Sequence, residues 1–214
     1  MCAHFESVRD PQRLKSRFNV SPPEQAKGDV WPTYPATFIR LSQPVDPSNH
    51  HAPEALIGSF GLIPHWSKDS KIARHTYNAR TETVSDKPAF KDAWRLRRLC
   101  IIPAEAIYEP DWRSGQAIST RITRQDQEPL GIAGIWTGWR NEGGEIIRSF
   151  SMLTINADEH PFMKNFHKPD EEKRMVVILE ESNYSDWLNS TGTDCLRYLR
   201  PFPAERLTSA APSK

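Results

Sequence analysis

The sequence has 214 residues, 37% of them hydrophobic and 10% aromatic, which is enough for one domain with a sizeable core. Its formal net charge of +1 leaves any binding of nucleic acid to local basic clusters, because the overall charge supplies no attraction. The 18 prolines and 10 glycines argue against a helical bundle and favour short elements joined by turns.

The cysteines and the apolar runs indicate where the protein resides. Cys2, Cys100 and Cys195 are widely spaced and form no CxxC pair, so we expect a reducing compartment and no structural metal or cofactor. The longest aliphatic run, residues 175–179, is far too short to cross a bilayer. We therefore expect a soluble, cytoplasmic protein without membrane contact.

The first half of the chain predicts one helix and then strands. Asp10 and Pro11 supply an N-cap and a proline in the first turn, and Leu14 and Phe18 form one apolar stripe. The other elements expected here are a strand at 34–41, a loop at 44–53, a strand at 56–62 and a helix at 87–94.

The second half predicts an antiparallel sheet. Two short buried strands are expected on either side of Pro103, and the segment 141–144 reads as a hairpin turn. The expected elements are strands at 100–102, 106–108, 117–122, 131–137, 146–155 and 175–179, and helices at 158–165 and 181–188.

These elements together predict an α+β protein. We expect a single domain over residues 2–200 around a largely antiparallel, barrel-like sheet with a few short flanking helices. Residues 201–214 are expected to form a loosely held C-terminal tail.

Cys2 offers unusual chemistry once Met1 is removed, which a small second residue permits. Its α-amine and thiol would then lie on one residue, both partly nucleophilic near neutral pH. Such a pair condenses with an aldehyde to an imine and closes to a thiazolidine, and the open form of an abasic deoxyribose is such an aldehyde. From its position alone, however, Cys2 is more often an incidental residue at a poorly ordered terminus.

Several short blocks of the sequence carry a more specific signal. They read MC at 1–2, FNVSP at 18–22, GLIPHW at 61–66, YNARTET at 77–83, RLCIIPAEAIYE at 98–109 and HKPDEEKRMVVIL at 167–179. In this order they resemble the SRAP (SOS-response-associated peptidase) family. Any one block is weak evidence, but the ordered set extends from the start of the chain to Leu179.

The resemblance implies that Cys2 is the nucleophile and that Asn78, Glu109 and His167 surround it. Glu109 would carry protons to and from the amine and the imine carbinol, although beside Pro110 it also fits a solvated turn. His167 would protonate the sugar ring oxygen, because imidazole titrates near neutral pH. Asn78 can both donate and accept hydrogen bonds, which suits it to hold the amino terminus and a sugar hydroxyl.

A second histidine, His160, competes with His167. We prefer His167 because it opens the family's segment from histidine to Arg-Met, which here ends at 174–175. Apart from the resemblance, Asn78 fits an ordinary turn residue and His167 a surface residue at a helix end.

Residues for contact with DNA are expected nearby. Arg80 follows Asn78 by two positions, so in an extended segment both side chains face one side, where Arg80 can hold the adjacent phosphate. Thr154 matches a family position that lines the pocket, although it also fits an ordinary strand residue. We expect these two residues to bind the substrate.

Aromatic and further basic residues complete the expected substrate contacts. Trp66 and Phe60 can stack with bases, although both also fit core positions. Arg174 and the run WRLRR at 94–98 are further basic candidates, although charged runs are usually only solvated.

Four departures from the family pattern bear on these roles. Ala3-His4 replaces the usual Gly-Arg after the cysteine, which weakens or moves a phosphate contact. Leu99 replaces an arginine, Pro110 stands where a tryptophan commonly follows the glutamate, and residues 167–174 form a longer segment than in the shortest members. None of these changes removes a candidate for catalysis.

The resemblance predicts the function as well. We expect a monomer that recognises abasic sites in single-stranded DNA and crosslinks to them as a thiazolidine through Cys2. It would protect the lesion during the DNA damage (SOS) response, show lyase-type activity, and associate with the nucleoid when bound to DNA. The alternatives are an N-terminal-cysteine peptidase or amidohydrolase, which requires an oxyanion hole, and a non-catalytic single-strand binder that uses Trp66, Arg80 and Arg174.

Overall fold

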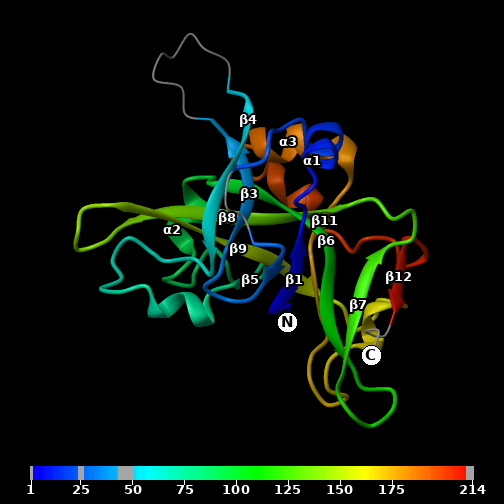
Figure 1. Ribbon diagram of the computed structural model, residues 1–214. Coiled ribbons are helices and arrows are strands. Elements are labelled where there is room, and N and C mark those ends of the chain that lie inside the picture. Colours follow the sequence, from blue (N-terminus) through cyan, green and yellow to red (C-terminus); the bar gives the residue numbers. More distant parts are fainter. Residues whose placement is uncertain (1, 24–26, 43–50, 211–214) are drawn as a thin grey trace.

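Five strands of the computed structural model close into a ring (Figure 1). They are β3 (Pro35–Leu41), β4 (Pro53–Phe60), β9 (Ile146–Asn156), β8 (Leu130–Arg140) and β6 (Leu99–Asp111). Each pairs with the next, and β6 pairs back to β3 through Ile101 and Ile39. Within this ring of described strands, the pairing of β4 with β9 is parallel and the other four are antiparallel. The largely antiparallel, barrel-like α+β architecture is thereby confirmed, within described residues 2–23, 27–42 and 51–210.

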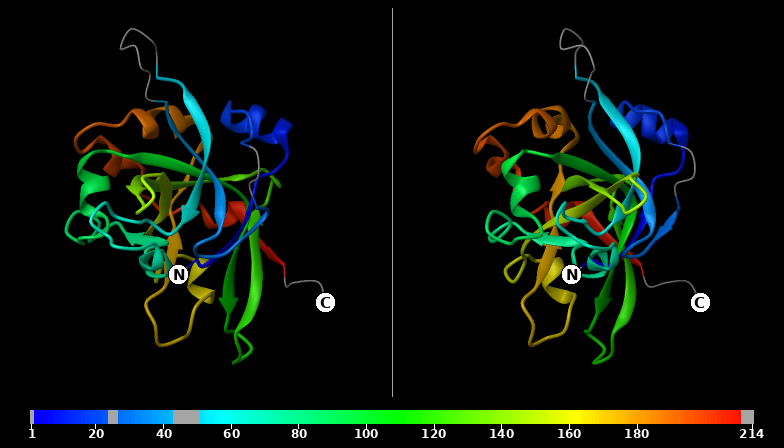
Figure 2. Two further views of the ribbon diagram at one scale, coloured as in Figure 1. Left: turned by 60° about the vertical axis from the view of Figure 1, so that its left-hand side comes forward. Right: turned by 90° about the vertical axis from the view of Figure 1, so that its left-hand side faces the viewer.

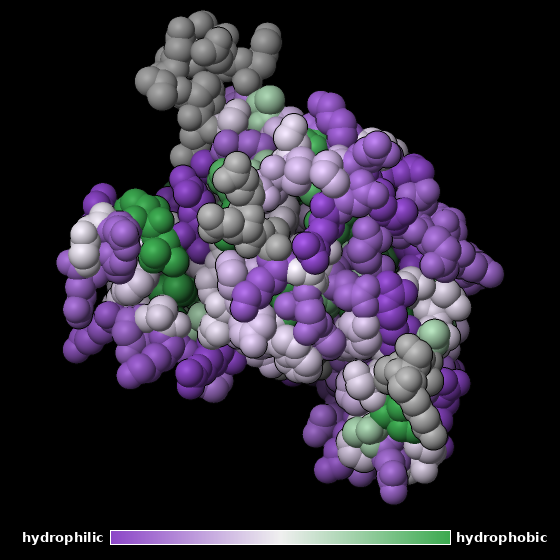
Figure 3. All heavy atoms as spheres, viewed as in Figure 1, coloured by the Kyte–Doolittle hydropathy of each residue, from purple (hydrophilic) through white to green (hydrophobic). Residues whose placement is uncertain are grey.

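Aromatic side chains fill part of the space that the barrel encloses. Phe60 contacts Phe5 and Phe150 with ring centroids 5.1 and 5.6 Å apart, and Phe38 lies 5.6 Å from Phe150. All four rings are fully buried. Because apolar residues gather inside, the molecular face in Figure 3 is largely hydrophilic, with small hydrophobic areas.

Strand β6 is the longest strand and organises the rest of the sheet. Two short strands interrupted by Pro103 were expected here, but one strand runs through the proline. Proline has no backbone N–H and so donates no hydrogen bond to the sheet, but the Pro103 carbonyl still accepts one from the Val8 N–H at 3.2 Å. The first half of β6 pairs with β8 and the second half with β7 (Ile118–Arg124), so β6 reaches beyond the barrel.

Short strands extend this framework. They are β1 (His4–Ser7), β2 (Asp29–Val30), β5 (Asn78–Arg80), β10 (Arg174–Val176), β11 (Ile178–Leu179) and β12 (Leu207–Ala210). The single strand expected at 175–179 is divided at Val177, which bonds to both neighbours: its N–H donates to Leu153 and its carbonyl accepts from Ala133. The chain therefore passes from β9 to β8 at this residue.

The helices are short and lie around the barrel. They are α1 (Pro11–Phe18), α2 (Lys91–Arg95) and α3 (Tyr184–Asn189), with 3-10 turns η1 (Lys71–His75), η2 (Met163–Asn165), η3 (Glu181–Asn183), η4 (Asp194–Tyr198) and η5 (Ala204–Arg206). The Asp10 cap of α1 is confirmed, because its carboxylate accepts from Gln12 and Arg13. Among the described residues, no helix has the length and apolar character needed to span a membrane.

Two predicted helices are shorter than expected. The segment 87–94 becomes helical only at Lys91, after a series of turns. The segment 158–165 contains only the 3-10 turn η2, because Pro161 supplies no N–H and the His160 side chain accepts from the N–H groups of Phe162 and Met163. Most of the loop expected at 44–53 lies outside the described residues, and β4 begins at Pro53.

The expected loose tail requires a correction. Phe202 is 2% exposed and belongs to the core, and β12 pairs with β7 from Leu207↔Arg124 to Ala210↔Arg121. Apolar burial and strand pairing therefore hold residues 201–210 to the fold. Residues 211–214 lie outside the described part of the chain.

Figure 2 shows where the outer end of β6 leads. The β6–β7 hairpin (green) extends away from the barrel, and the loop that precedes β10 (yellow) lies beside it. A bridge between Asp111 and Phe166 joins the two segments. This junction lies next to the start of β1, because His4 pairs with Tyr108 in β6.

Candidate active site

Cys2 is held in the fold. It is 1% exposed, and its carbonyl accepts a hydrogen bond from Asn78 Nδ2 at 2.7 Å. Its thiol donates to the His4 carbonyl at 3.4 Å. Burial raises the pKa of the Cys2 thiol well above its usual range, and the negative charge of Glu109 raises it further. The thiol is therefore protonated near neutral pH.

The pairing of β1 with β6 brings Cys2 to this position. His4 pairs with Tyr108 and Phe5 with Ile107 in an antiparallel register. Continued by two residues, the register brings Cys2 opposite Pro110, the neighbour of Glu109. Fully buried Phe5 fixes this register, because a slip by one residue would turn its ring out of the core.

Glu109 and His167 form a buried pair. Glu109 Oε2 and His167 Nε2 lie 3.1 Å apart, with side chains 2% and 6% exposed. His167 adopts φ of +68°, a left-handed conformation that a residue other than glycine rarely takes. Its N–H donates to the Pro110 carbonyl at 2.9 Å, which fixes the backbone there. Strain of this kind concentrates at functional sites.

The short strand β5 places Asn78 against Cys2. Asn78 pairs with Met152 in the parallel β5–β9 ladder and is 8% exposed. The preceding residue, Tyr77, is a site residue that the sequence analysis did not identify. Burial raises the pKa of the Tyr77 phenol, and electrostatic interactions with Cys2 and Glu109 raise it further. Its sequence signal is its place at the start of the block YNARTET, beside Asn78.

His160, the competing histidine, lies in a different environment. Its Nε2 donates to the Phe202 carbonyl at 2.7 Å, while Nδ1 accepts from the N–H groups of Phe162 and Met163 at 3.2 and 3.0 Å. Both ring nitrogens therefore serve local structure. Of the two histidines, His167 is the one that lies against Glu109.

The arginines near the site share acidic partners. Arg174 is 2% exposed and donates to Glu82, Glu172 and Thr154. The side chain of Arg80 is 48% exposed, and its Nη1 lies 2.8 Å from Glu172 Oε2. Arg174 is thus a buried anchor, whereas Arg80 reaches the surface from extended strand β5. Thr154 is 1% exposed and accepts from Arg174 through its hydroxyl at 3.2 Å.

The two aromatic candidates differ in exposure. Trp66 is 49% exposed, and its Nε1–H donates to the Pro88 carbonyl at 3.4 Å, so its ring is available for stacking. Phe60 is fully buried among aromatic rings of the barrel, and we therefore assign it to packing rather than to base stacking.

Two arginines of the basic run at 94–98 make contacts within the protein. The guanidinium of Arg97 lies 4.8 Å from the ring centroid of buried Trp94, and Arg98 donates to Thr137 at 3.0 Å. Arg95 is exposed. No group of three or more His, Cys, Asp or Glu side chains suited to a metal ion occurs within residues 2–23, 27–42 and 51–210.

Comparisons with known proteins identify the family of this chain. A family model described as SOS response associated peptidase (SRAP) matches residues 1–214. Abasic site processing protein YoqW of Bacillus subtilis is 32% identical over 216 residues, covering 96% of this chain and 89% of the relative. Abasic site processing protein HMCES of Mus musculus is 26% identical over 214 residues, covering 85% of this chain and 55% of the relative.

Solved structures resemble the whole fold. A crystal structure of a protein from Bordetella bronchiseptica is 45% identical, with a TM-score of 0.90 and full coverage of both chains. A protein from Bacteroides thetaiotaomicron shares the fold with a TM-score of 0.80 at 21% identity, covering 98% of this chain and 91% of that one. With a family model matched along its full length, the chain belongs to the SRAP family.

Proposed function

We propose that this protein recognises abasic sites in single-stranded DNA and binds them covalently through Cys2 after Met1 is removed. The observation that carries the proposal is the position of Cys2, tied to Asn78 at 2.7 Å and under the electrostatic influence of Glu109, which is paired with His167. The names of YoqW and HMCES, both abasic site processing proteins, support DNA with this lesion as the substrate.

The reaction needs only the groups of one residue and one aldehyde. The freed Cys2 amine attacks C1′ of the open-chain deoxyribose, and the resulting carbinolamine loses water to form an imine. The sulfur then adds to the imine carbon while the nitrogen receives the thiol proton. One C–N and one C–S bond form, one water leaves, and a thiazolidine joins the protein to DNA.

The buried pair beside Cys2 can move the protons that these steps require. Glu109 would accept the proton that the amine loses when it attacks, and later the proton of the thiol. His167, 3.1 Å from Glu109, would donate a proton to the sugar ring oxygen and to the departing carbinol oxygen. Because both side chains are almost fully buried, water competes little with this transfer.

Residues around the pair would hold the strand. Arg80 is exposed enough to bind a phosphate by exchanging its contact with Glu172. Arg174 would act indirectly, by holding Glu82, Glu172 and the Thr154 segment in place. Exposed Trp66 offers a ring for base stacking.

Strand cleavage is a second outcome open to the same intermediate. The imine acidifies the adjacent C2′, so loss of that proton expels the 3′ phosphate by β-elimination. Ring closure by the Cys2 sulfur removes the C=N bond and suppresses this path. We therefore propose crosslinking as the main outcome and lyase-type cleavage as a minor one.

The state of the Cys2 thiol favours this function over peptide hydrolysis, the activity in the family description. Cysteine hydrolases depend on a thiolate with a lowered pKa. Here burial and Glu109 raise the pKa of the Cys2 thiol. An imine carbon is more electrophilic than an amide carbonyl, so addition to it demands less of a neutral thiol beside a base than attack on a stable amide does.

Intact-mass spectrometry tests the proposal. The processed protein, incubated with an oligonucleotide whose uracil has been excised, should gain the oligonucleotide mass less one water. An oligonucleotide with intact uracil is the control and should leave the protein mass unchanged. Protein that has lost Met1 and yet gains no mass would contradict the proposal.

A further inference from the structure

Three aromatic rings form a stack beside the candidate site. The His4 imidazole lies between the rings of Trp31 and Tyr108, with centroids 4.1 Å apart and planes inclined by 12° on both sides. Cys2 lies two residues before His4 in the chain, and Glu109 directly follows Tyr108. The stack is therefore close to both residues along the chain, and Tyr108 and Glu109, being consecutive in β6, point to opposite faces of that strand.

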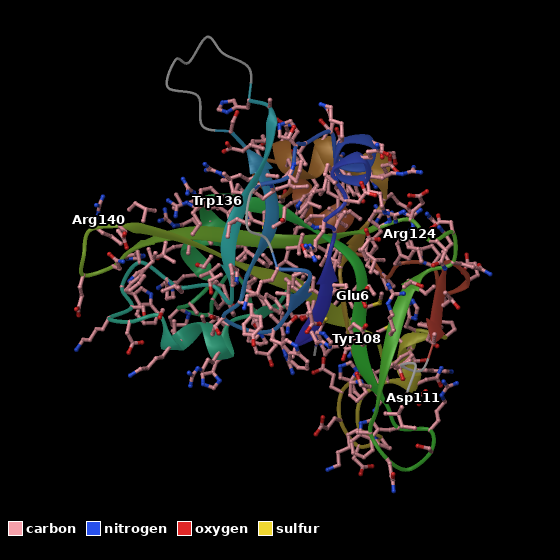
Figure 4. All side chains as sticks on the ribbon, viewed as in Figure 1. Glu6, Tyr108, Asp111, Arg124, Trp136 and Arg140 are labelled. Carbon is pink, nitrogen blue, oxygen red and sulfur yellow. The ribbon has the colours of Figure 1, made fainter. Side chains whose placement is uncertain are left out.

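Acidic side chains hold the rings in place. The carboxylate of Asp29 contacts His4 Nε2 through one oxygen and accepts from Trp31 Nε1 at 3.3 Å through the other. At the other end, the Tyr108 hydroxyl donates to Glu6, whose position beside Tyr108 is visible in Figure 4. Because each outer ring has a fixed polar partner, the stack is preorganised.

The turn that presents Trp31 is strained. Trp31 is the first residue of a β-turn closed by the Tyr34 N–H and the Trp31 carbonyl at 2.9 Å, with Pro32 at the second position. Thr33 at the third position has φ of +77°, which is unfavourable for a β-branched residue and usual for glycine. The Thr33 N–H donates to the Phe60 carbonyl, which ties the turn to the barrel.

The outer ring of the stack is open on one side. Trp31 is 43% exposed, and since His4 covers one face of the indole, a ligand would approach the opposite face. A large aromatic ring held rigidly at the surface by a strained turn points to a flat ligand. The nucleobases of single-stranded DNA are flat and stack on aromatic side chains irrespective of sequence.

We propose that Trp31 stacks with the nucleobase next to the abasic sugar and that His4 and Tyr108 form its rigid backing. This inference rests on the proposed function, because that function supplies the DNA strand. It assigns His4 to supporting the stack, since its ring is enclosed between two others and its Nε2 is occupied by Asp29.

A comparison of variants and oligonucleotides tests the inference. The protein, Trp31→Ala and Trp31→Phe are titrated with oligonucleotides carrying a tetrahydrofuran abasic analogue, which binds reversibly. In one set both neighbouring nucleotides carry bases, and in the others one neighbour is a second tetrahydrofuran. We expect Trp31→Ala to bind the base-containing set about tenfold more weakly, equivalent to about 1.4 kcal/mol, and Trp31→Phe to retain most of the affinity.

The decisive result is the dependence on the neighbouring base. The difference between the protein and Trp31→Ala should disappear when one particular neighbour lacks its base. An equal loss on every oligonucleotide would assign Trp31 to structure alone, and no loss on any would also overturn the inference. The affinities for the tetrahydrofuran oligonucleotides do not depend on crosslinking. Failure of the covalent chemistry on a natural abasic site would therefore be recognised separately.

Discussion

At the scale of single residues, the candidate site is a set of side chains distant in the sequence and joined by a few contacts. Cys2 and Asn78 meet through one hydrogen bond, and Glu109 and His167 through one close pair. The resemblance to SRAP proteins named these four residues, but no spacing in the sequence could have brought them together. Tyr77 was missed because a tyrosine beside a strand asparagine predicts nothing until its neighbours are known.

The negative charge of Glu109 predicts a shift in the reactivity of Cys2. Since that charge raises the pKa of the Cys2 thiol, Glu109→Gln should lower it, and Cys2 should be alkylated faster at each pH over the range in which the protein stays folded. Peptide-level mass spectrometry separates Cys2 from the other two cysteines. Glu105→Gln is the matched control, because Glu105 lies on the same strand but binds Arg13. An unchanged rate of alkylation for Glu109→Gln would contradict the electrostatic contact.

The hydrogen bond from Asn78 predicts a different kind of loss. Asn78→Ala leaves the buried Cys2 carbonyl without its donor, at a cost of about 1–3 kcal/mol. We expect slower adduct formation because Cys2 is then less well held, with alkylation of its thiol maintained. Gel assays of adduct against time provide the measurement, and a wild-type rate in Asn78→Ala would show that the contact is dispensable.

At the scale of elements, the hydrophobic pattern and the N-cap signal predicted the long strands and helix α1 better than they predicted the short strands. The Asp10 cap and the Gly-rich hairpin turn at 141–144 are local signals and are confirmed. Strands β1 and β5 were not predicted as members of the sheet because three or four residues carry little periodicity and are held by their neighbours. Pro103 misled the prediction of β6, since proline is tolerated where no N–H partner is required.

The turn that ends in Tyr34 predicts a stabilising substitution. Thr33 has φ of +77°, so Thr33→Gly should relieve backbone strain and raise the free energy of unfolding by about 1 kcal/mol. Urea unfolding of the two proteins measures this difference. Thr83→Gly is a useful comparison, because Thr83 does not have positive φ and should lose stability when replaced by glycine. A destabilised Thr33→Gly would show that the threonine conformation is unstrained.

At the scale of the whole molecule, closure of the barrel and attachment of the C-terminal segment create one cooperative fold. Sequence patterning predicted the architecture, but it placed residues 201–214 in a loose tail because the last residues of a chain are commonly poorly ordered. The decisive contacts are long-range: Phe202 enters the core, and β12 pairs with β7. Such contacts leave no local trace in the sequence.

This attachment predicts a large loss of stability when Phe202 is truncated. Phe202 is 2% exposed, so Phe202→Ala should lower the free energy of unfolding by about 3–5 kcal/mol. Leu196→Ala, at a residue that is 50% exposed, should change it by less than about 0.5 kcal/mol. Denaturant-induced unfolding of both variants tests the prediction. If Phe202→Ala changed the free energy of unfolding as little as Leu196→Ala does, residues 201–210 would contribute little to stability and the expected loose tail would be correct.

The central claim is that nitrogen and sulfur of Cys2 bind the same carbon of an abasic sugar. The most direct measurement compares the adducts of the protein and Cys2→Ser, each with Met1 removed, after heating in denaturant with and without prior borohydride reduction. We predict that the unmodified protein retains its DNA in both cases, whereas Cys2→Ser retains it only after reduction and cleaves more of the strand. Equal survival of the two unreduced adducts would contradict ring closure by sulfur.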